Sequence, residues 1–93
     1  MESYPLNHAN GTINAISIDI LFDPGSTNNF IAKYIIQKLA LPTFKNANSW
    51  DLHLPDIQQH CNLVCKFTLI IGTYSEELTF DVANLPEHEI ILS

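Results

Sequence analysis

Alternation of apolar with other side chains along the chain predicts several β-strands. In the stretch Ile13 to Phe22 (INAISIDILF), every second residue from position 16 onward is apolar, so these side chains share one face of an extended chain. Glu77 to Val82 (ELTFDV) alternates in the same way. Trp50–Leu54, Cys61–Ile71 and Glu89–Leu92 are further predicted strands. The chain is therefore expected to be mostly β.

The apolar period changes between Asn29 and Leu41, where apolar residues recur at helical intervals. This pattern predicts one helix that covers residues 30–39 and packs on the sheet. Asn28 or Asn29 is the expected N-cap, and Pro42 lies beyond the expected end.

Polar stretches with turn-forming residues separate these elements. Asn10-Gly11 is a turn signal within the polar residues 1–12, and Gly72 to Ser75 is another. Residues 43–51 are expected to form a polar connection. Pro55 to Gln59 predicts a hairpin or a projecting loop between two strands.

Length and charge restrict the classes of protein to consider. A chain of 93 residues indicates a single domain. It contains four Lys, no Arg and ten acidic residues, so it has no basic stripe that could neutralise phosphates, and we expect no nucleic-acid partner. The longest apolar runs are too short to span a bilayer, and the first residues (MESYP) are no signal peptide. A cytoplasmic location without membrane association is therefore expected.

The two cysteines lie four residues apart in a predicted strand. On a strand, Cys61 and Cys65 share one face at roughly 13 Å, which is too far for a disulfide. Their spacing to the histidines matches no zinc signature. We expect two free thiols, no metal and no cofactor.

Residue types exclude most hydrolase chemistry and leave one acidic residue. The chain lacks a G-x-S-x-G elbow and a glycine-rich phosphate loop. A cysteine hydrolase with Cys61 or Cys65 and a His is formally possible, but both thiols lie within a predicted strand with only weak local cues for a lowered pKa. Asp23 ends an apolar strand and is followed by Pro24, Gly25 and Ser26, which holds a carboxylate at a rigid turn. The alternative interpretation is a structural Asp that accepts backbone N–H bonds in an Asx-type turn.

Two longer segments resemble one known family. Ile20 to Ile31 (ILFDPGSTNNFI), followed by Lys38 to Pro42 (KLALP), is similar to the protease segment of Ty3/Gypsy-type long-terminal-repeat retrotransposons. Phe80 to Leu92 (FDVANLPEHEIIL) is similar to the same family's Phe-x-Val-x-x-Leu-x-x-x-x-Ile-Ile-Leu-Gly segment. The two blocks have the family's order and separation, and together they cover about half of the chain.

The resemblance implies an all-β fold with one short helix: a retropepsin-like acid-protease lobe, closed like a β-barrel, as one subunit of a two-fold homodimer. The chain would be a single aspartic protease domain, 1–93, shortened at its C-terminus, that processes a retroelement polyprotein and could reside in virus-like particles. Asp23 would be the catalytic residue of an endopeptidase that cleaves polypeptides. The residues around it would have these roles: Pro24, Gly25 and Ser26 form the active-site loop; Thr27, Asn28, Asp56 and Ile57 bind substrate; Leu54 to Gln59 form a flap.

Three positions depart from the family pattern. Pro24 stands where Ser or Thr is usual, Ile57 where the flap tip has Gly, and Ser93 where Gly follows Leu92. The second hypothesis is therefore a degenerate or truncated protease-like domain that serves as a binding or dimerisation module. A cellular retropepsin-like domain, as in ubiquitin-linked shuttle proteins, is a third, although the helix-ending Leu-Ala-Leu-Pro favours the retroelement.

Overall fold

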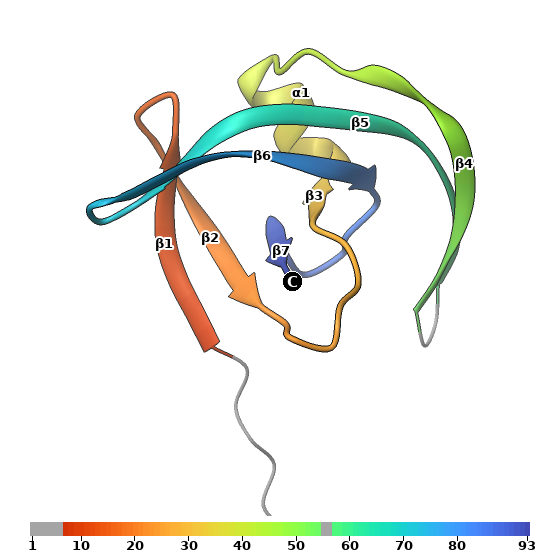
Figure 1. Cartoon of the computed structure of the whole chain (residues 1–93), viewed down its shortest axis with the longest axis horizontal. Helices are drawn as coiled ribbons and strands as arrows, with labels where there is room; N and C mark the ends of the chain where they lie inside the picture. The colour runs from red at the N-terminus through yellow and green to blue at the C-terminus, as the bar shows by residue number, and fades with distance from the viewer. Residues whose placement is uncertain (1–6, 55–56) are drawn as a thin grey trace, which may run out of the picture.

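The computed structural model describes residues 7–54 and 57–93, and the side chains of residues 7–46 and 62–93. Within these residues the elements are β1 (Asn7–Ile13), β2 (Ile16–Phe22), β3 (Phe30–Ala32), α1 (Lys33–Leu39), β4 (Phe44–Leu54), β5 (Ile57–Ile71), β6 (Tyr74–Ala83) and β7 (Ile90–Leu92). Figure 1 shows the long strands β5 and β6 curving over the short strands β2, β3 and β7. The prediction of a mostly β chain with one short helix is confirmed.

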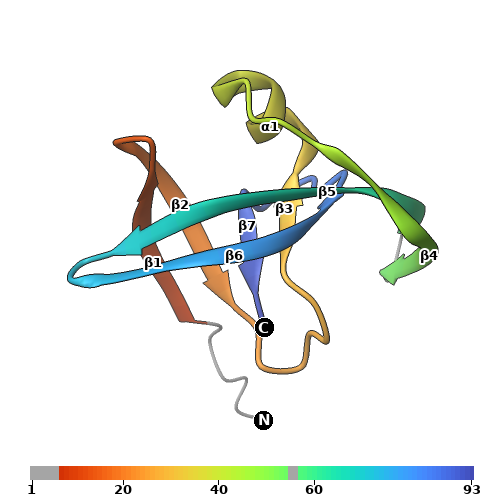
Figure 2. The ribbon, with the colours of Figure 1, turned by 45° about the horizontal axis from the view of Figure 1, so that its top comes forward.

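Six of these strands close into a barrel. Their order around it is β1-β2-β7-β3-β6-β5, and a pairing of Thr12 with Ile70 joins β5 back to β1. β4 extends the sheet beyond β5. The short strand β7 lies between β2, to which it is parallel, and β3, to which it is antiparallel. Segments from both ends of the chain therefore meet in the middle of the sheet, as Figure 2 also shows. A closed barrel agrees with the β-barrel-like lobe that the sequence resemblance implies.

The turn predicted at Asn10-Gly11 is wrong, because both residues lie within β1. The chain turns instead at Asn14 and Ala15, which have φ angles of 50° and 66°. Two positive φ angles in a two-residue hairpin loop give the tight turn that matches the strand twist. Gly11 has a packing role: a Cβ there would lie 2.6 Å from Ile20 Cδ1 and 2.8 Å from the Ile70 carbonyl oxygen. The missing side chain lets β5 approach β1 and close the barrel.

The predicted helix is shorter than expected at its start. Phe30–Ala32 form β3, which is buried between β6 and β7, and only Lys33–Leu39 are helical. An apolar run of three residues fits a fully buried strand as well as a helical stripe, so periodicity could not separate the two. The N-cap is Ala32 without a side-chain hydrogen bond, so the prediction of Asn28 or Asn29 is wrong. The helix ends at Leu39, before Pro42 as expected, and its C-cap Ala40 has the left-handed conformation.

The hairpin of β4 and β5 is longer than predicted. β4 begins at Phe44, so the polar connection expected over 43–51 is wrong, and a register shift between Lys45 and Trp50 accounts for the polar residues there. Ile57 pairs with Leu54, which leaves a shorter loop than the predicted one. Asp56 lies outside the described residues.

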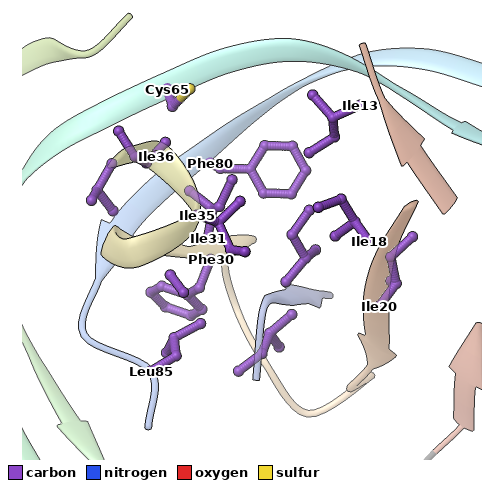
Figure 3. Close-up of a cluster of buried hydrophobic side chains, with 14 of the residues drawn as sticks. Ile13, Ile18, Ile20, Phe30, Ile31, Ile35, Ile36, Cys65, Phe80 and Leu85 are labelled. Atoms are coloured by element: carbon purple, nitrogen blue, oxygen red, sulfur yellow. The ribbon is translucent and has the colours of Figure 1, made fainter. Parts of the chain in front are cut away.

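Apolar side chains from β1, β2, β3, α1, β5, β6 and β7 fill the barrel (Figure 3). Phe80 is fully buried and stacks on Phe67 with ring centroids 4.4 Å apart, and Ile35 of α1 is also fully buried. Cys65 is a buried free thiol, and burial raises its pKa. The side chain of Cys61 is outside the described set. None of the helices in the described residues could cross a membrane.

Candidate active site

Asp23 directly follows β2, where a parallel strand holds it in place. Phe22 pairs with Leu92 of β7, and the Asp23 N–H donates a hydrogen bond to the Leu92 carbonyl oxygen at 2.8 Å. The β-ladder therefore extends one residue beyond β2, and Asp23 is the last extended residue, as predicted. Its half-buried side chain leaves the sheet at the carboxyl end of β2 and β7.

The loop after Asp23 is organised by that residue's own oxygens. Its Oδ1 accepts a hydrogen bond from the Gly25 N–H at 3.0 Å, and its carbonyl oxygen accepts one from the Ser26 N–H at 3.0 Å. This is the Asx-type turn of the alternative interpretation. The turn occupies one carboxyl oxygen, and no hydrogen bond of the described residues engages Oδ2. A structural turn and an available carboxylate therefore coexist at Asp23.

Pro24 and Gly25 are exposed at the tip of this loop. Pro24 has neither a side-chain hydroxyl nor an N–H group, so it adds no donor to the loop. A Cβ at Gly25 would lie 3.3 Å from Asp23 Oδ1, a contact tighter than van der Waals packing prefers. Glycine therefore leaves the carboxyl group room to accept the Gly25 N–H.

The second half of the loop is tied to β6. The Ser26 hydroxyl donates to the Asn28 carbonyl oxygen at 2.7 Å, and Asn28 Nδ2 donates to Asp81 Oδ2 at 3.0 Å. Thr27 is exposed. The structure thus brings Asp23, Ser26 and Asn28 into one loop, whereas Asp56 and the Ile57 side chain lie outside the described set. Figure 1 shows β4 and β5 curving towards the side of the barrel on which this loop lies.

Two residues of this network were not predicted as site residues. Asn29 accepts hydrogen bonds from the backbone N–H and the hydroxyl of Ser93 on its Oδ1, at 3.0 and 3.1 Å, and its carbonyl oxygen accepts the Asp81 N–H at 2.9 Å. Asp81 fixes both Asn28 and Asn29. In the sequence, Asp81 is marked only as a carboxylate at the outward position of an otherwise apolar strand end. Its partner Asn28 lies 53 residues away along the chain, so the sequence does not reveal the contact.

A cavity of about 520 Å³ lies next to the ends of β2 and β7. It is lined by Phe22, Asn29, Ile71, Tyr74, Glu76, Leu78, Leu92 and Ser93. Asp23 is not among these residues. Its lining includes Phe22 and Leu92, which flank Asp23 in the paired strands, and Asn29 and Ser93, which are hydrogen-bonded to each other.

A second polar cluster lies around Asp19, in the middle of β2. His8 Nδ1 is 3.5 Å from Asp19 Oδ2, and the Asp19 N–H donates to Glu89 Oε1 at 2.7 Å. The Tyr34 hydroxyl donates to the carbonyl oxygen of His88 at 3.4 Å. Burial, followed by the charges of Glu89 and Asp19, raises the pKa of Tyr34. In the part of the chain that the structure describes, no three His, Cys, Asp or Glu side chains form a metal-binding group.

The closed barrel and the Asp-x-Gly loop between β2 and β3 define a retropepsin-like aspartic protease lobe. Residues 19–93 match the family described as the PEG10/RTL1 protease domain. The chain belongs to this family of retropepsin-like, Ty3/Gypsy-derived aspartic protease domains, which confirms the resemblance seen in the sequence. A search of curated proteins found no match.

Proposed function

We propose that this protein is one subunit of a homodimeric aspartic endopeptidase to which each chain contributes Asp23. The observation that carries the proposal is the placement of this carboxyl at the end of two parallel strands, with Oδ1 held by the Gly25 N–H and Oδ2 available. The protease domain family supports the same class of activity.

The chemistry requires two such carboxyls. When two Asp side chains lie about 3 Å apart, they share one proton, because both cannot ionise at that distance. The ionised oxygen takes a proton from a water molecule, and the protonated partner donates to the carbonyl oxygen of the peptide bond. Asp23 is in the single Asp-x-Gly triplet of these 93 residues, and in this proposal a second copy of the chain supplies the other carboxyl.

Loop features support a symmetric contact at this position. Pro24 and Gly25 are exposed, and glycine at the tip adds no side chain between two loops that approach each other. The loop is also rigid, because Asp23 and Asn29 are each bonded to the end of the chain, through Leu92 and Ser93. A rigid carboxyl loses little entropy when it pairs with its symmetry mate.

The substrate would be a polypeptide that lies across the two Asp23 side chains. Thr27 and Asn28 would contact it from the loop, and the hairpin of β4 and β5 would cover it. Asp56 and Ile57 would be further substrate contacts, as the family resemblance implies. Cleavage of the polyprotein that contains the domain, in the cytoplasm or in virus-like particles, is the process that this activity fits.

Pro24 favours a second candidate function, a binding or dimerisation module without catalysis. In the resembling family a hydroxyl at this position bonds to the backbone of the opposing loop, and Pro24 cannot form that bond. The loss of two symmetric hydrogen bonds would weaken the dimer by about 1–3 kcal/mol.

The test mixes wild-type chains with Asp23→Asn chains at constant total concentration and measures peptide cleavage. The amide keeps the Asx turn, since its Oδ1 still accepts the Gly25 N–H, but it cannot act as the base. If each site needs two Asp23 carboxyls, activity falls with the square of the wild-type fraction. Asp19→Asn, the same chemical change on β2, is the matched control. Mixing Asp19→Asn chains with wild-type chains should leave the rate of cleavage unchanged.

Two results would contradict the enzyme hypothesis. A protein that sediments as a dimer but cleaves no peptide between pH ~3.5 and 7 would be a binding or dimerisation module instead. Cleavage by pure Asp23→Asn protein would show that Asp23 is not the catalytic residue.

A further inference from the structure

Asp81 is an acidic residue in the middle of the barrel sheet. It pairs with Phe30 of β3 on one side and with Val64 of β5 on the other, and the next two residues of its strand are buried and apolar. A half-buried carboxylate in such a place needs hydrogen-bond donors. Within the described residues, the donor that reaches it is Asn28 Nδ2 at 3.0 Å.

This contact fixes which way the Asn28 carboxamide faces. A carboxylate only accepts hydrogen bonds, so the NH₂ group of Asn28 must face Asp81, and its Oδ1 must face away. The reverse orientation would place two acceptors against each other. The nearby backbone oxygens are already engaged, that of Asn28 by the Ser26 hydroxyl and that of Asn29 by the Asp81 N–H. Asn28 Oδ1 thus remains as an acceptor five residues after Asp23.

We infer that Asp81 is a positioning residue that presents Asn28 Oδ1 to the peptide substrate as a hydrogen-bond acceptor. The enzyme therefore selects substrates whose side chain beside Asn28 carries a hydrogen-bond donor. The inference rests on the proposed peptidase function. Peptides with Lys, Arg, Gln or Asn at the subsite beside Asn28 fit this acceptor, whereas Asp or Glu would place one acceptor on another. The net charge of −6 acts in the same direction against acidic peptides.

Three variants separate this role from a structural one. Asp81→Leu removes the acceptor, so the carboxamide can turn over, and discrimination between donor-bearing and acidic peptides should fall by roughly tenfold, mainly through KM. Asp81→Asn can still accept from Asn28 through its own Oδ1 and should retain most of the discrimination. The double variant Asn28→Asp/Asp81→Asn reverses the hydrogen bond and places a carboxylate at position 28, so preference for Lys and Arg over Gln should rise by roughly tenfold.

The assay is a set of peptides that vary one position at a time around a single cleavage site. If Asp81→Leu folds and cleaves with the wild-type preference profile, the inference is wrong. If the double variant shows no gain for Lys and Arg at any position, Asn28 does not contact the substrate and the inference is also wrong.

A binding experiment keeps the inference testable if no variant cleaves. A peptide with a reduced, uncleavable bond and Gln, Lys or Glu at the varied position is titrated while NMR follows the Asn28 side-chain NH₂ signals. Weaker binding of the Glu peptide to wild-type protein, lost in Asp81→Leu, supports the inference even if the catalytic proposal fails. Equal binding of the three peptides, or no binding of any, would overturn it.

Discussion

The backbone N–H of Asp23 donates a hydrogen bond to the carbonyl oxygen of Leu92 at 2.8 Å. The residue proposed to act on substrate is therefore positioned by a strand that begins 67 residues later, at Ile90. Because β7 contains only three residues, its buried side chains determine whether it stays beside β2.

Leu92→Ala should lower the free energy of unfolding by about 2–4 kcal/mol, because it removes a buried side chain that packs beside Phe22. Leu85→Ala, at an equally buried residue between β6 and β7, should cost a similar amount. NMR should separate the two: the Asp23 and Gly25 amide shifts should change in Leu92→Ala and stay in place in Leu85→Ala. Equal changes in both variants would show that β7 does not position the loop.

Gly11→Ala should destabilise the barrel by about 1–3 kcal/mol, because its methyl group meets Ile20 Cδ1 and the backbone oxygen of Ile70. Chemical denaturation measures this loss. Ile20→Val removes the Cδ1 atom that clashes. Adding Gly11→Ala to an Ile20→Val protein should therefore cost less stability than adding it to wild-type protein. Full stability of Gly11→Ala would mean that β1 and β5 are not held this closely.

Ala15→Gly should stabilise the protein by about 1 kcal/mol. Ala15 has a φ of 66°, and a left-handed conformation costs a residue with a Cβ roughly 1–2 kcal/mol. The substitution also produces Asn-Gly, the favoured pair for this hairpin turn. Ala9→Gly, in the preceding strand, is the control and should destabilise, since glycine there only adds freedom to the unfolded chain. A lower thermal midpoint for Ala15→Gly would contradict the turn geometry.

Cys65 should make stability fall at high pH. Burial raises the pKa of its thiol in the folded state, so the folded protein holds the proton where the unfolded chain has released it. The stabilising contribution is complete below the unfolded pKa, roughly 8.5, and is lost as pH rises above it. In a Cys61→Ala background, denaturation between pH 7 and 10 should show this fall, and Cys61→Ala/Cys65→Val should lack it. Rapid labelling of Cys65 at pH 8 would contradict its burial.

Pro24→Thr should tighten the proposed dimer by roughly tenfold, since it restores a hydroxyl to each of two symmetric loops. Sedimentation measures the dissociation constant. Pro24→Ala, which removes the ring but adds no hydroxyl, is the control and should leave the constant closer to that of wild-type protein. If Pro24→Ala tightens the dimer as much as Pro24→Thr does, the tighter binding comes from the greater backbone freedom of the loop and not from the hydroxyl.

The sequence by itself determined the strand that leads to Asp23, the tight loop after it and the family. These features are local: alternation sets the face of a strand, and Pro24 and Gly25 dictate a break. The family follows because ILFDPGSTNNFI and FDVANLPEHEIIL are continuous segments that can be compared residue by residue.

Only the tertiary structure decided which residues hold that loop. Phe30–Ala32 became a strand because β6 and β7 pair with them on both sides, and Gly11 lies in a strand because β5 passes close to it. Asn29 and Asp81 entered the site in the same way, through partners far along the chain. Such contacts exist only once the barrel has closed, because an isolated segment contains no record of which strand will lie beside it.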